Sequence, residues 1–324
     1  MTSLDHLLPE AGEALRCADH ARRIAIDPGG TAIRADRVVV VETGLPWPKP
    51  VFDHPTLREL DPLFKSAPRP TRLLACQPDD DPSTGIWVFD RLDTSTGSRT
   101  RERRFAVSSP NELLELSDCL AAETAGGRPT SGPVQPTFDG LMVEQAVLIC
   151  TQGSHDVCCG SDGARLALAS ENLSLHAGAS PPRVFRVSHT GGHRFAPTAM
   201  TLPDGRMWAY LGAEMLVDIL TGAGDPADLA QYCRGWWGAD RGPAQVAERA
   251  VFAQVGFALD RLRRTVAEVS PGSYAVEADD GAGEQTSWTV AVELLREVPT
   301  IACRQPGGQP IKVTQEYGAI VKKQ

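Results

Sequence analysis

The sequence predicts an α/β protein, and three observations lead to this prediction. Short apolar runs of strand length recur along most of the chain. Longer amphipathic stretches lie between them, flanked by residues that start and stop helices. The chain of 324 residues is 42% hydrophobic and 23% charged, which is ordinary for a globular protein with two or three compact cores.

Residues 1–127 are predicted to form a first α/β domain. Its strand-like runs occupy residues 37–44, 72–77, 85–92 and 101–107. A helix follows, with Ser109 as its N-cap before Pro110, and a pair of glycines ends it. Residues 128–140 are rich in Gly and Pro, and we interpret them as a linker.

Residues 141–224 are predicted to form a second α/β domain. Its expected strands cover 144–150, 183–189 and 206–212, and its expected helices cover 162–175 and 213–222. This order is typical of a thioredoxin-like layer, although other mixed sheets share it. The first domain repeats the order weakly, since "RLLACQPDDD" resembles "AVLICTQGSHD". We therefore interpret the first domain as a degenerate thioredoxin-like copy without the site.

Residues 225–324 are predicted to form a C-terminal α+β extension. A helix is expected over 242–262, where apolar residues recur at helical spacing. Short strands are expected at about 265–277, 286–295 and 299–304. This pattern indicates a helix packed on a small antiparallel sheet.

Charge and hydropathy exclude several classes of protein. The net charge of −9 argues against nucleic-acid binding, and we interpret the one basic run, "RTRERR" at 99–104, as a solvated strand face. The N-terminus lacks the apolar stretch of a signal peptide, and no apolar run is long enough to span a membrane. We therefore expect a cytoplasmic protein. In that reducing compartment the eight cysteines favour metal binding or redox chemistry over disulfides.

Two loops carry the residues with metal-binding chemistry. In "CTQGSHDVCC", Cys150 ends a buried strand, and Cys158 and Cys159 follow within the loop. In "HTGGH", His189 and His193 are separated by two glycines that allow a tight turn. Soft thiolates and neutral imidazoles are the ligands that zinc and iron–sulfur centres prefer. The two loops together therefore predict a metal or cluster site.

The residues alone leave the kind of metal open. A tetrahedral Cys2His2 zinc site would be structural. The usual zinc-finger spacing places few residues between the cysteines, and the longer spacing here disfavours a finger. The alternative is a [2Fe-2S] cluster with two thiolate and two imidazole ligands. A Rieske pattern interleaves Cys and His within each loop, whereas this chain separates them.

The motifs "CTQGSHDVCCG" and "HTGGHRFAPTAMTLPDGRMWAYLG", together with "VVVVETGLPWP", resemble the sucrase/ferredoxin-like family over about residues 15–220. The resemblance implies a thioredoxin-like ferredoxin domain whose [2Fe-2S] cluster is held by C-x8-C and H-x3-H. On this chain the pattern selects Cys150, Cys159, His189 and His193. Cys158 departs from it as an alternative ligand to Cys159. The word sucrase implies no activity here, because no paired carboxylates suggest glycoside hydrolysis.

This ligand set predicts an electron carrier or redox component rather than a stand-alone enzyme. Replacing two thiolates by neutral imidazoles makes the cluster easier to reduce, and potentials move from about −400 mV toward the Rieske range. Imidazoles that reach solvent would couple the electron to a proton. No dinucleotide or phosphate-binding motif is present, so a redox partner protein is expected. The oligomeric state stays open.

Two alternatives remain from the sequence: a zinc-stabilised interaction protein, and a thiol oxidoreductase using Cys158 and Cys159. Other polar residues of the Cys loop, His155 and Asp156, could hydrogen-bond a ligand or shuttle a proton, but we interpret them first as exposed loop residues. The scattered cysteines, Cys17 and Cys303 among them, are interpreted as buried structural residues.

Overall fold

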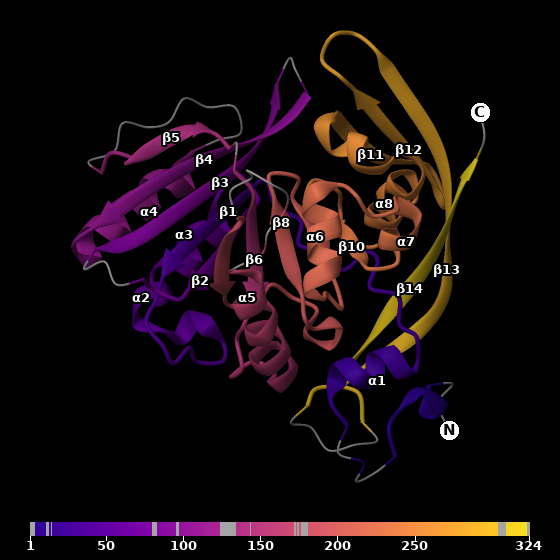
Figure 1. Cartoon of the computed structure of the whole chain (residues 1–324), viewed down its shortest axis with the longest axis horizontal. Coiled ribbons are helices and arrows are strands. Elements are labelled where there is room, and N and C mark those ends of the chain that lie inside the picture. The colour runs from indigo at the N-terminus through magenta and orange to yellow at the C-terminus, as the bar shows by residue number, and fades with distance from the viewer. Residues whose placement is uncertain are drawn as a thin grey trace.

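The computed structural model of the chain describes residues 4–10, 13, 15–79, 83–94, 97–123, 134–142, 144–171, 173, 175, 181–303 and 309–322. Figure 1 shows a large sheet that runs through the molecule and a second, smaller sheet along one side. The predicted α/β class is therefore confirmed. Among the described helices, none has both the length and the apolar character needed to cross a membrane.

The large sheet has ten strands in the order β10-β9-β8-β6-β7-β2-β1-β3-β4-β5. Its strands are β1 (Arg37–Glu42), β2 (Thr71–Cys76), β3 (Thr84–Thr94), β4 (Gly97–Val107), β5 (Phe138–Leu141), β6 (Ala146–Cys150), β7 (Arg183–Val187), β8 (Ala199–Leu202), β9 (Arg206–Trp208) and β10 (Cys233–Trp236). Sequence periodicity located most of these strands and missed β5, β8 and β10, which are only four residues long.

The ten strands contain one arrangement twice. In the first half, β1 and β2 are parallel, β3 pairs antiparallel with β1, and β4 pairs antiparallel with β3. In the second half, β6, β7, β8 and β9 repeat the same neighbours and directions. The two halves meet where β2 and β7 pair antiparallel at Cys76 and Val187. The topology is thus repeated, but in a different register from the weak sequence repeat, because "RLLACQ" forms β2, the counterpart of β7, whereas "AVLIC" forms β6, the counterpart of β1. The thioredoxin-like assignment and the domain boundaries stay predictions.

Helices occupy matching places in the two halves. In the first half α2 (Pro55–Arg58) and α3 (Leu60–Ser66) connect the parallel strands, and α4 (Pro110–Ala122) follows the last strand of the unit. In the second half α5 (Ala164–Ser170) and α6 (Ala213–Thr221) take these places. The N-cap expected for α4 is present, since Ser109 accepts a hydrogen bond from the amide of Glu112. The residues after α4, where the linker is predicted, lie partly outside the described residues, and β5 occupies the end of that segment.

The apolar strands β1 and β6 are buried at every position. Because successive side chains of a strand point to opposite faces of the sheet, both faces of these strands must be covered by other residues. In β1, Val39 and Val41 pack toward α3 and α4, whereas Val38 and Val40 pack on the other face. That second face forms one continuous core with residues of β6, β8 and β9 from the other half. The two halves therefore share a core, which fixes the loops at the strand ends relative to each other.

The C-terminal region confirms the expected helix on an antiparallel sheet. It contains α7 (Pro226–Ala230), α8 (Pro243–Val255), a 3-10 turn (Gly256–Arg261), and the strands β11 (Arg263–Ser270), β12 (Ser273–Asp279), β13 (Gln285–Thr300) and β14 (Lys312–Lys322). The strand expected over 265–277 is instead a hairpin of β11 and β12, because the chain turns at Gly272 with φ +71°. The two strands expected at 286–295 and 299–304 merge into β13.

A buried ion-pair network joins the two sheets. The carboxylate of Glu248 on α8 lies 2.8 Å from Arg206 on β9 and 2.9 Å from Arg264 on β11. All three side chains are fully buried. Because an unpaired charge at this depth would be costly, the network fixes α8 between the sheets.

The basic run at 99–104 is not the solvated face expected from sequence. It lies in β4, where the Arg103 guanidinium is buried and pairs with Glu123 at 2.8 Å and with Asp90 at 2.9 Å. The physical reason is that β4 is an inner strand between β3 and β5. Arg101 and Arg104 stay partly exposed, but the Arg101 guanidinium pairs with Asp139 at 2.6 Å and that of Arg104 pairs with Glu102 at 2.7 Å.

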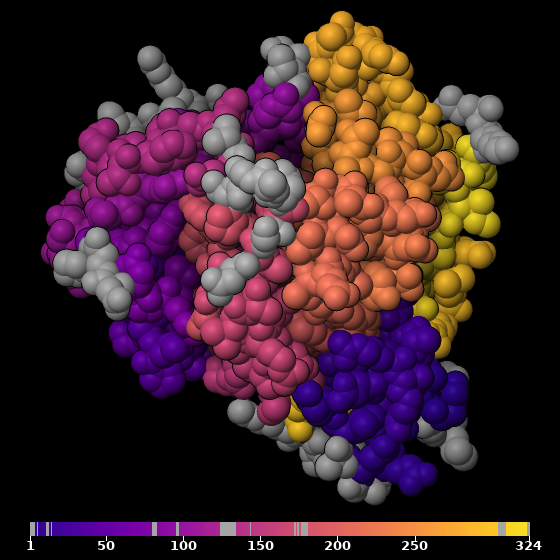
Figure 2. Space-filling model, viewed as in Figure 1, coloured from indigo at the N-terminus to yellow at the C-terminus, as the bar shows by residue number. Residues whose placement is uncertain are grey.

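The N-terminal segment packs across the end of the second half. Its helix α1 (Cys17–Arg23) lies near the strands of the C-terminal sheet in Figure 1, and in Figure 2 the indigo segment covers one end of the molecule. The Arg16 guanidinium pairs with Asp162 at 2.6 Å, and Arg22 donates to the carbonyl of Ala196 at 3.0 Å. The segment thereby covers the loops that follow β6 and β7.

Candidate metal centre

The cysteine loop begins at the end of β6 and runs into a helical segment (Cys159–Gly163) that continues as α5. This segment passes directly against the backbone of Cys150. A Cβ atom at Gly163 would overlap the carbonyl oxygen of Cys150 and lie 3.1 Å from its carbonyl carbon. Only glycine allows this approach, which places Cys159 beside Cys150.

The histidine loop follows β7, the parallel neighbour of β6. Gly191 and Gly192 have φ values of +81° and +68°, which turn the chain so that His193 starts a 3-10 turn (His193–Phe195). Because parallel strands end at the same edge of a sheet, the residues that follow β6 and β7 meet there. Cys150 and His189 therefore come from neighbouring strand ends.

Three residues form a first cluster, here called the Cys150 group: Cys150, Cys159 and His189. Their donor atoms all lie within 4.8 Å of one another. Both sulfurs are buried, and Nδ1 of His189 is buried without a hydrogen-bond partner. Such an unpaired nitrogen is unfavourable unless something binds it. These residue types and this spacing suit a soft metal ion or cluster.

Proton positions in the Cys150 group favour metal binding. The Cys159 thiol donates to Cys150, which holds the pKa of Cys150 well below its usual range and raises that of Cys159. Burial lowers the pKa of His189, so its imidazole is neutral near pH 7. The group thus offers a thiolate, a thiol and a neutral imidazole as ligands.

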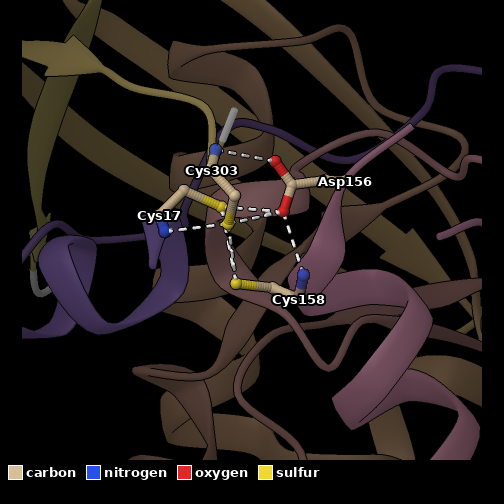
Figure 3. A group of neighbouring side chains, drawn as sticks. All are labelled: Cys17, Asp156, Cys158 and Cys303. Carbon is tan, nitrogen blue, oxygen red and sulfur yellow. Dashed lines mark hydrogen bonds between the residues drawn. The ribbon is translucent and has the colours of Figure 1, made fainter. Parts of the chain in front are cut away.

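Four residues form a second cluster, here called the Cys17 group: Cys17, Asp156, Cys158 and Cys303 (Figure 3). They come from α1, from the cysteine loop and from the segment after β13. The Cys158 sulfur lies 3.7 Å from that of Cys17 and 3.3 Å from that of Cys303. The thiols of Cys17 and Cys303 donate to it and lower the pKa of Cys158 to about 3.

The carboxylate of Asp156 connects the Cys17 group to His193. Its Oδ2 lies 3.1 Å from Nδ1 of His193, which is also 3.4 Å from the Cys17 sulfur. Burial alone would raise the pKa of Asp156, but hydrogen bonds from His193, Cys303 and the Cys158 amide hold it well below its usual range. The carboxylate is therefore ionised and can orient the imidazole.

The structure thus brings together three of the four residues selected from the sequence. His193 lies beside the Cys17 group, with its ring centroid 6.1 Å from that of His189. Cys158 faces the Cys17 group, so it does not stand beside Cys150 as an alternative to Cys159. Metal binding by any of these residues stays a prediction.

The exposure expected for Asp156 was wrong, since this residue is 2% accessible and faces the buried sulfurs. The burial expected for Cys17 is present, whereas Cys303 is half-buried, and both cysteines contact Cys158. The contacts span 141 and 145 residues, so no local spacing in the sequence could reveal them. His155 is half-buried and stacks on His189 with ring centroids 3.5 Å apart.

The family assignment agrees with this geometry. The model of the sucrase/ferredoxin-like family matches residues 28–235, which is more than half of the chain. The chain belongs to the sucrase/ferredoxin-like family. The match includes the Cys150 group and both loops, whereas Cys17 and Cys303 lie outside it. No curated protein and no solved structure matches the chain.

Arginines without acidic partners surround the histidine loop of this sucrase/ferredoxin-like chain. Arg194 and Arg234 are buried and Arg72 is half-buried, and none of them forms an ion pair with a carboxylate among the described residues. Arg72 donates to the carbonyl of His189 at 2.6 Å. Burial lowers the pKa of Arg234 to about 9, while the charges of Cys150 and Cys159 act in the opposite direction. The surroundings of the site therefore favour negative charge.

A cavity of about 460 Å³ opens beside the histidines of this sucrase/ferredoxin-like chain. His155, His189 and His193 line it, together with the cationic side chains of Arg72, Arg194, Arg241 and Lys312. The described residues of its wall include no carboxylate. The imidazoles can therefore be reached from solvent through a positively charged opening.

The matching position in the first half carries different chemistry. There β1 ends at Glu42, whose carboxylate accepts hydrogen bonds from the amides of Asp79 at 3.1 Å and Gly85 at 2.6 Å. No Cys and His cluster occurs at this strand end among the residues described. The site thus belongs to the second half alone.

Proposed function

We propose that this chain is a one-electron carrier that holds a [2Fe-2S] cluster through Cys150, Cys159, His189 and His193. One observation carries the proposal: two buried cysteines and a histidine whose buried Nδ1 has no hydrogen-bond partner converge at neighbouring strand ends in a member of the sucrase/ferredoxin-like family.

The donor set supports the proposal. Cys150, Cys159 and His189 offer two sulfurs and one nitrogen around one position. His193 supplies the fourth ligand, because Asp156 occupies its Nδ1 and leaves Nε2 to bind a metal. A carboxylate that holds the second nitrogen of a metal-binding histidine is a common arrangement, since it fixes the tautomer and the ring orientation.

The charges of the chain set the direction of the potential. A bound cluster would supply a centre that takes up and releases a single electron. Two neutral imidazoles in place of thiolates make the added electron less unfavourable. Arg72 and Arg234, which lack acidic partners among the described residues, act in the same direction. We therefore expect a midpoint potential well above about −400 mV, the value typical of four-thiolate plant-type ferredoxins.

The cavity provides a docking surface for a redox partner and a path for protons to the histidines. Its rim carries the exposed side chains of Arg241 and Lys312, so a redox partner with an acidic surface would dock there. The histidines that line the cavity can exchange protons with solvent, which couples reduction to proton uptake. We place the protein in the cytoplasm, where cysteines stay reduced and can bind metal.

The alternative of a thiol oxidoreductase lacks such support. A vicinal disulfide would need the sulfurs of Cys158 and Cys159 to face each other. They instead belong to different clusters. Zinc bound at the Cys150 group is the remaining alternative. The amounts of iron and zinc per chain distinguish it from an iron–sulfur cluster.

The test is an absorption spectrum of anaerobically purified full-length protein, with iron, sulfide and zinc assayed on the same sample. We expect about two irons and two sulfides per chain and bleaching on reduction with dithionite. The Cys150→Ser variant should lose the iron, whereas Cys119→Ser, on α4, should keep it. Wild-type protein that binds no iron after anaerobic reconstitution, or zinc that is lost only with Cys150, would refute the proposal.

A further inference from the structure

The Cys17 group is independent of the residues assigned to the cluster. It consists of three sulfurs and one carboxylate oxygen, and Figure 3 shows the four side chains pointing toward one another. Asp156 and both Cys17 and Cys158 are buried, while Cys303 is half-buried. Three separate segments of the chain therefore deliver polar and polarisable atoms to a single point inside the protein.

The spacing of these atoms corresponds to a tetrahedral ion. Zinc bound to sulfur at about 2.3 Å places tetrahedral sulfurs roughly 3.8 Å apart. The Cys158 sulfur lies 3.7 Å from Cys17 and 3.3 Å from Cys303. Oδ1 of Asp156 lies 3.2 Å from the Cys17 sulfur and 3.0 Å from the Cys303 sulfur. A disulfide would need about 2.05 Å between two sulfurs.

We propose that Cys17, Asp156, Cys158 and Cys303 form a structural zinc site. Three thiolates and Oδ1 of Asp156 complete four-fold coordination, and no position remains for water or substrate. Closed sites of this kind are structural, whereas catalytic zinc keeps an open position.

Backbone amides already surround the four donors. The amide of Cys17 donates to the Cys303 sulfur at 3.2 Å. The amide of Cys158 donates to Oδ1 of Asp156 at 3.0 Å, and that of Cys303 donates to Oδ2 at 3.3 Å. The bound ion and these N–H groups together offset the negative charge of three thiolates and a carboxylate.

The zinc site would connect α1 and the segment after β13 to the cysteine loop. Neither of these two segments belongs to the large sheet that carries the cysteine loop. The same carboxylate that binds zinc through Oδ1 accepts a hydrogen bond from His193 through Oδ2. Zinc would therefore help to orient His193. This last consequence rests on the proposed function, whereas the zinc site does not.

The test measures zinc and iron separately in full-length protein produced with both metals. Wild-type protein should hold about one zinc per chain, and Cys17→Ser and Cys303→Ser should hold at least about ten-fold less. Cys150→Ser should keep its zinc while losing iron, and the control Cys119→Ser should keep both. Iron and zinc thus report the two proposals independently.

A second measurement does not depend on the folding of any variant. The zinc X-ray absorption spectrum of wild-type protein that holds both metals should show three sulfurs at about 2.3 Å and one oxygen around the zinc. A zinc shell with two sulfurs and two nitrogens, or wild-type protein without zinc after Zn²⁺ reconstitution, would overturn the proposal. A disulfide between Cys158 and Cys303 in protein purified anaerobically, seen by mass spectrometry, would also overturn it.

Discussion

Gly163 offers the sharpest test of how the cysteine loop is built. Its dihedral angles, φ −63° and ψ −43°, are those of an ordinary helix, so its conformation requires no glycine. Its surroundings do, because a Cβ would overlap the carbonyl oxygen of Cys150 and lie 3.1 Å from the carbonyl carbon. The Gly163→Ala substitution therefore separates backbone conformation from steric fit.

The two effects have opposite signs. In a helix, alanine is more favourable than glycine by about 0.5–1 kcal/mol. Non-bonded carbon atoms normally approach to about 3.5–4.0 Å, so the helical segment and the end of β6 must separate. Overpacking of this kind costs about 1–3 kcal/mol and moves the backbone. Because a Cβ would overlap the Cys150 oxygen, the cost lies at the upper end of this range. We expect a net loss of about 2 kcal/mol in the free energy of unfolding, together with reduced iron retention because Cys150 is displaced.

Urea unfolding followed by tryptophan fluorescence measures the stability, and iron per chain measures the site. The matched control is Gly44→Ala, because a Cβ at Gly44 meets nothing within 4 Å and its backbone has no positive φ. That control should change the free energy of unfolding by no more than about 0.5 kcal/mol. If Gly163→Ala were as stable as the wild type and kept its iron, the close approach to Cys150 would be refuted.

Three further predictions concern charge. Glu248→Gln should lower the free energy of unfolding by about 3–5 kcal/mol, because it leaves the two buried guanidinium groups of Arg206 and Arg264 with a single carboxylate, Asp260. The exposed Glu214→Gln should have little effect, and equal urea midpoints would contradict this. His193→Cys should lower the cluster potential toward about −400 mV, since a charged ligand replaces a neutral one, and an unchanged potential in a redox titration would exclude His193 as a ligand. Burial lowers the pKa of His155 to about 3, so the unfolded chain alone takes up this proton between about pH 6.5 and 3. The free energy of unfolding of metal-free protein should therefore decrease as the pH is lowered from about 6.5 to 3. His155→Asn should make this pH dependence weaker. An unchanged pH dependence in urea titrations at several pH values would contradict the prediction.

Local pattern located the parts of the fold that depend on short stretches of sequence. The apolar runs of β1 and β6 identify strands buried on both faces, and Ser109 identifies the start of α4. Hydrophobic periodicity did not predict the elements whose structure depends on contacts with distant segments. The strand β8 has four residues, too few for a clear period, and is held by pairing with β6 and β9. The helix α1 is short and depends on contacts with the histidine loop.

The candidate site shows the same division. Cys150 and His189 could be selected from sequence because each lies at or just beyond the end of a recognisable strand, whereas the family resemblance alone selected Cys159 over Cys158. Asp156 could not be distinguished from other loop carboxylates, since its burial depends on α1 and on the segment after β13. The contacts of Cys17 and Cys303 could not be predicted for a related reason, because tertiary packing alone brings α1 and the segment after β13 to Cys158.

The adjacent cysteines explain why one loop can serve two clusters. Cys158 has helical dihedral angles, φ −63° and ψ −43°, and Cys159 begins the helical segment. Consecutive residues of a helix point about 100° apart, so two neighbouring side chains cannot face the same point. Cys159 accordingly faces Cys150, and Cys158 faces Cys17 and Cys303. The cysteine that departs from the family pattern is thus not a rival for the same ligand position. Cys158 belongs to the Cys17 group, and Asp156, two residues earlier, links that group to His193 through a hydrogen bond.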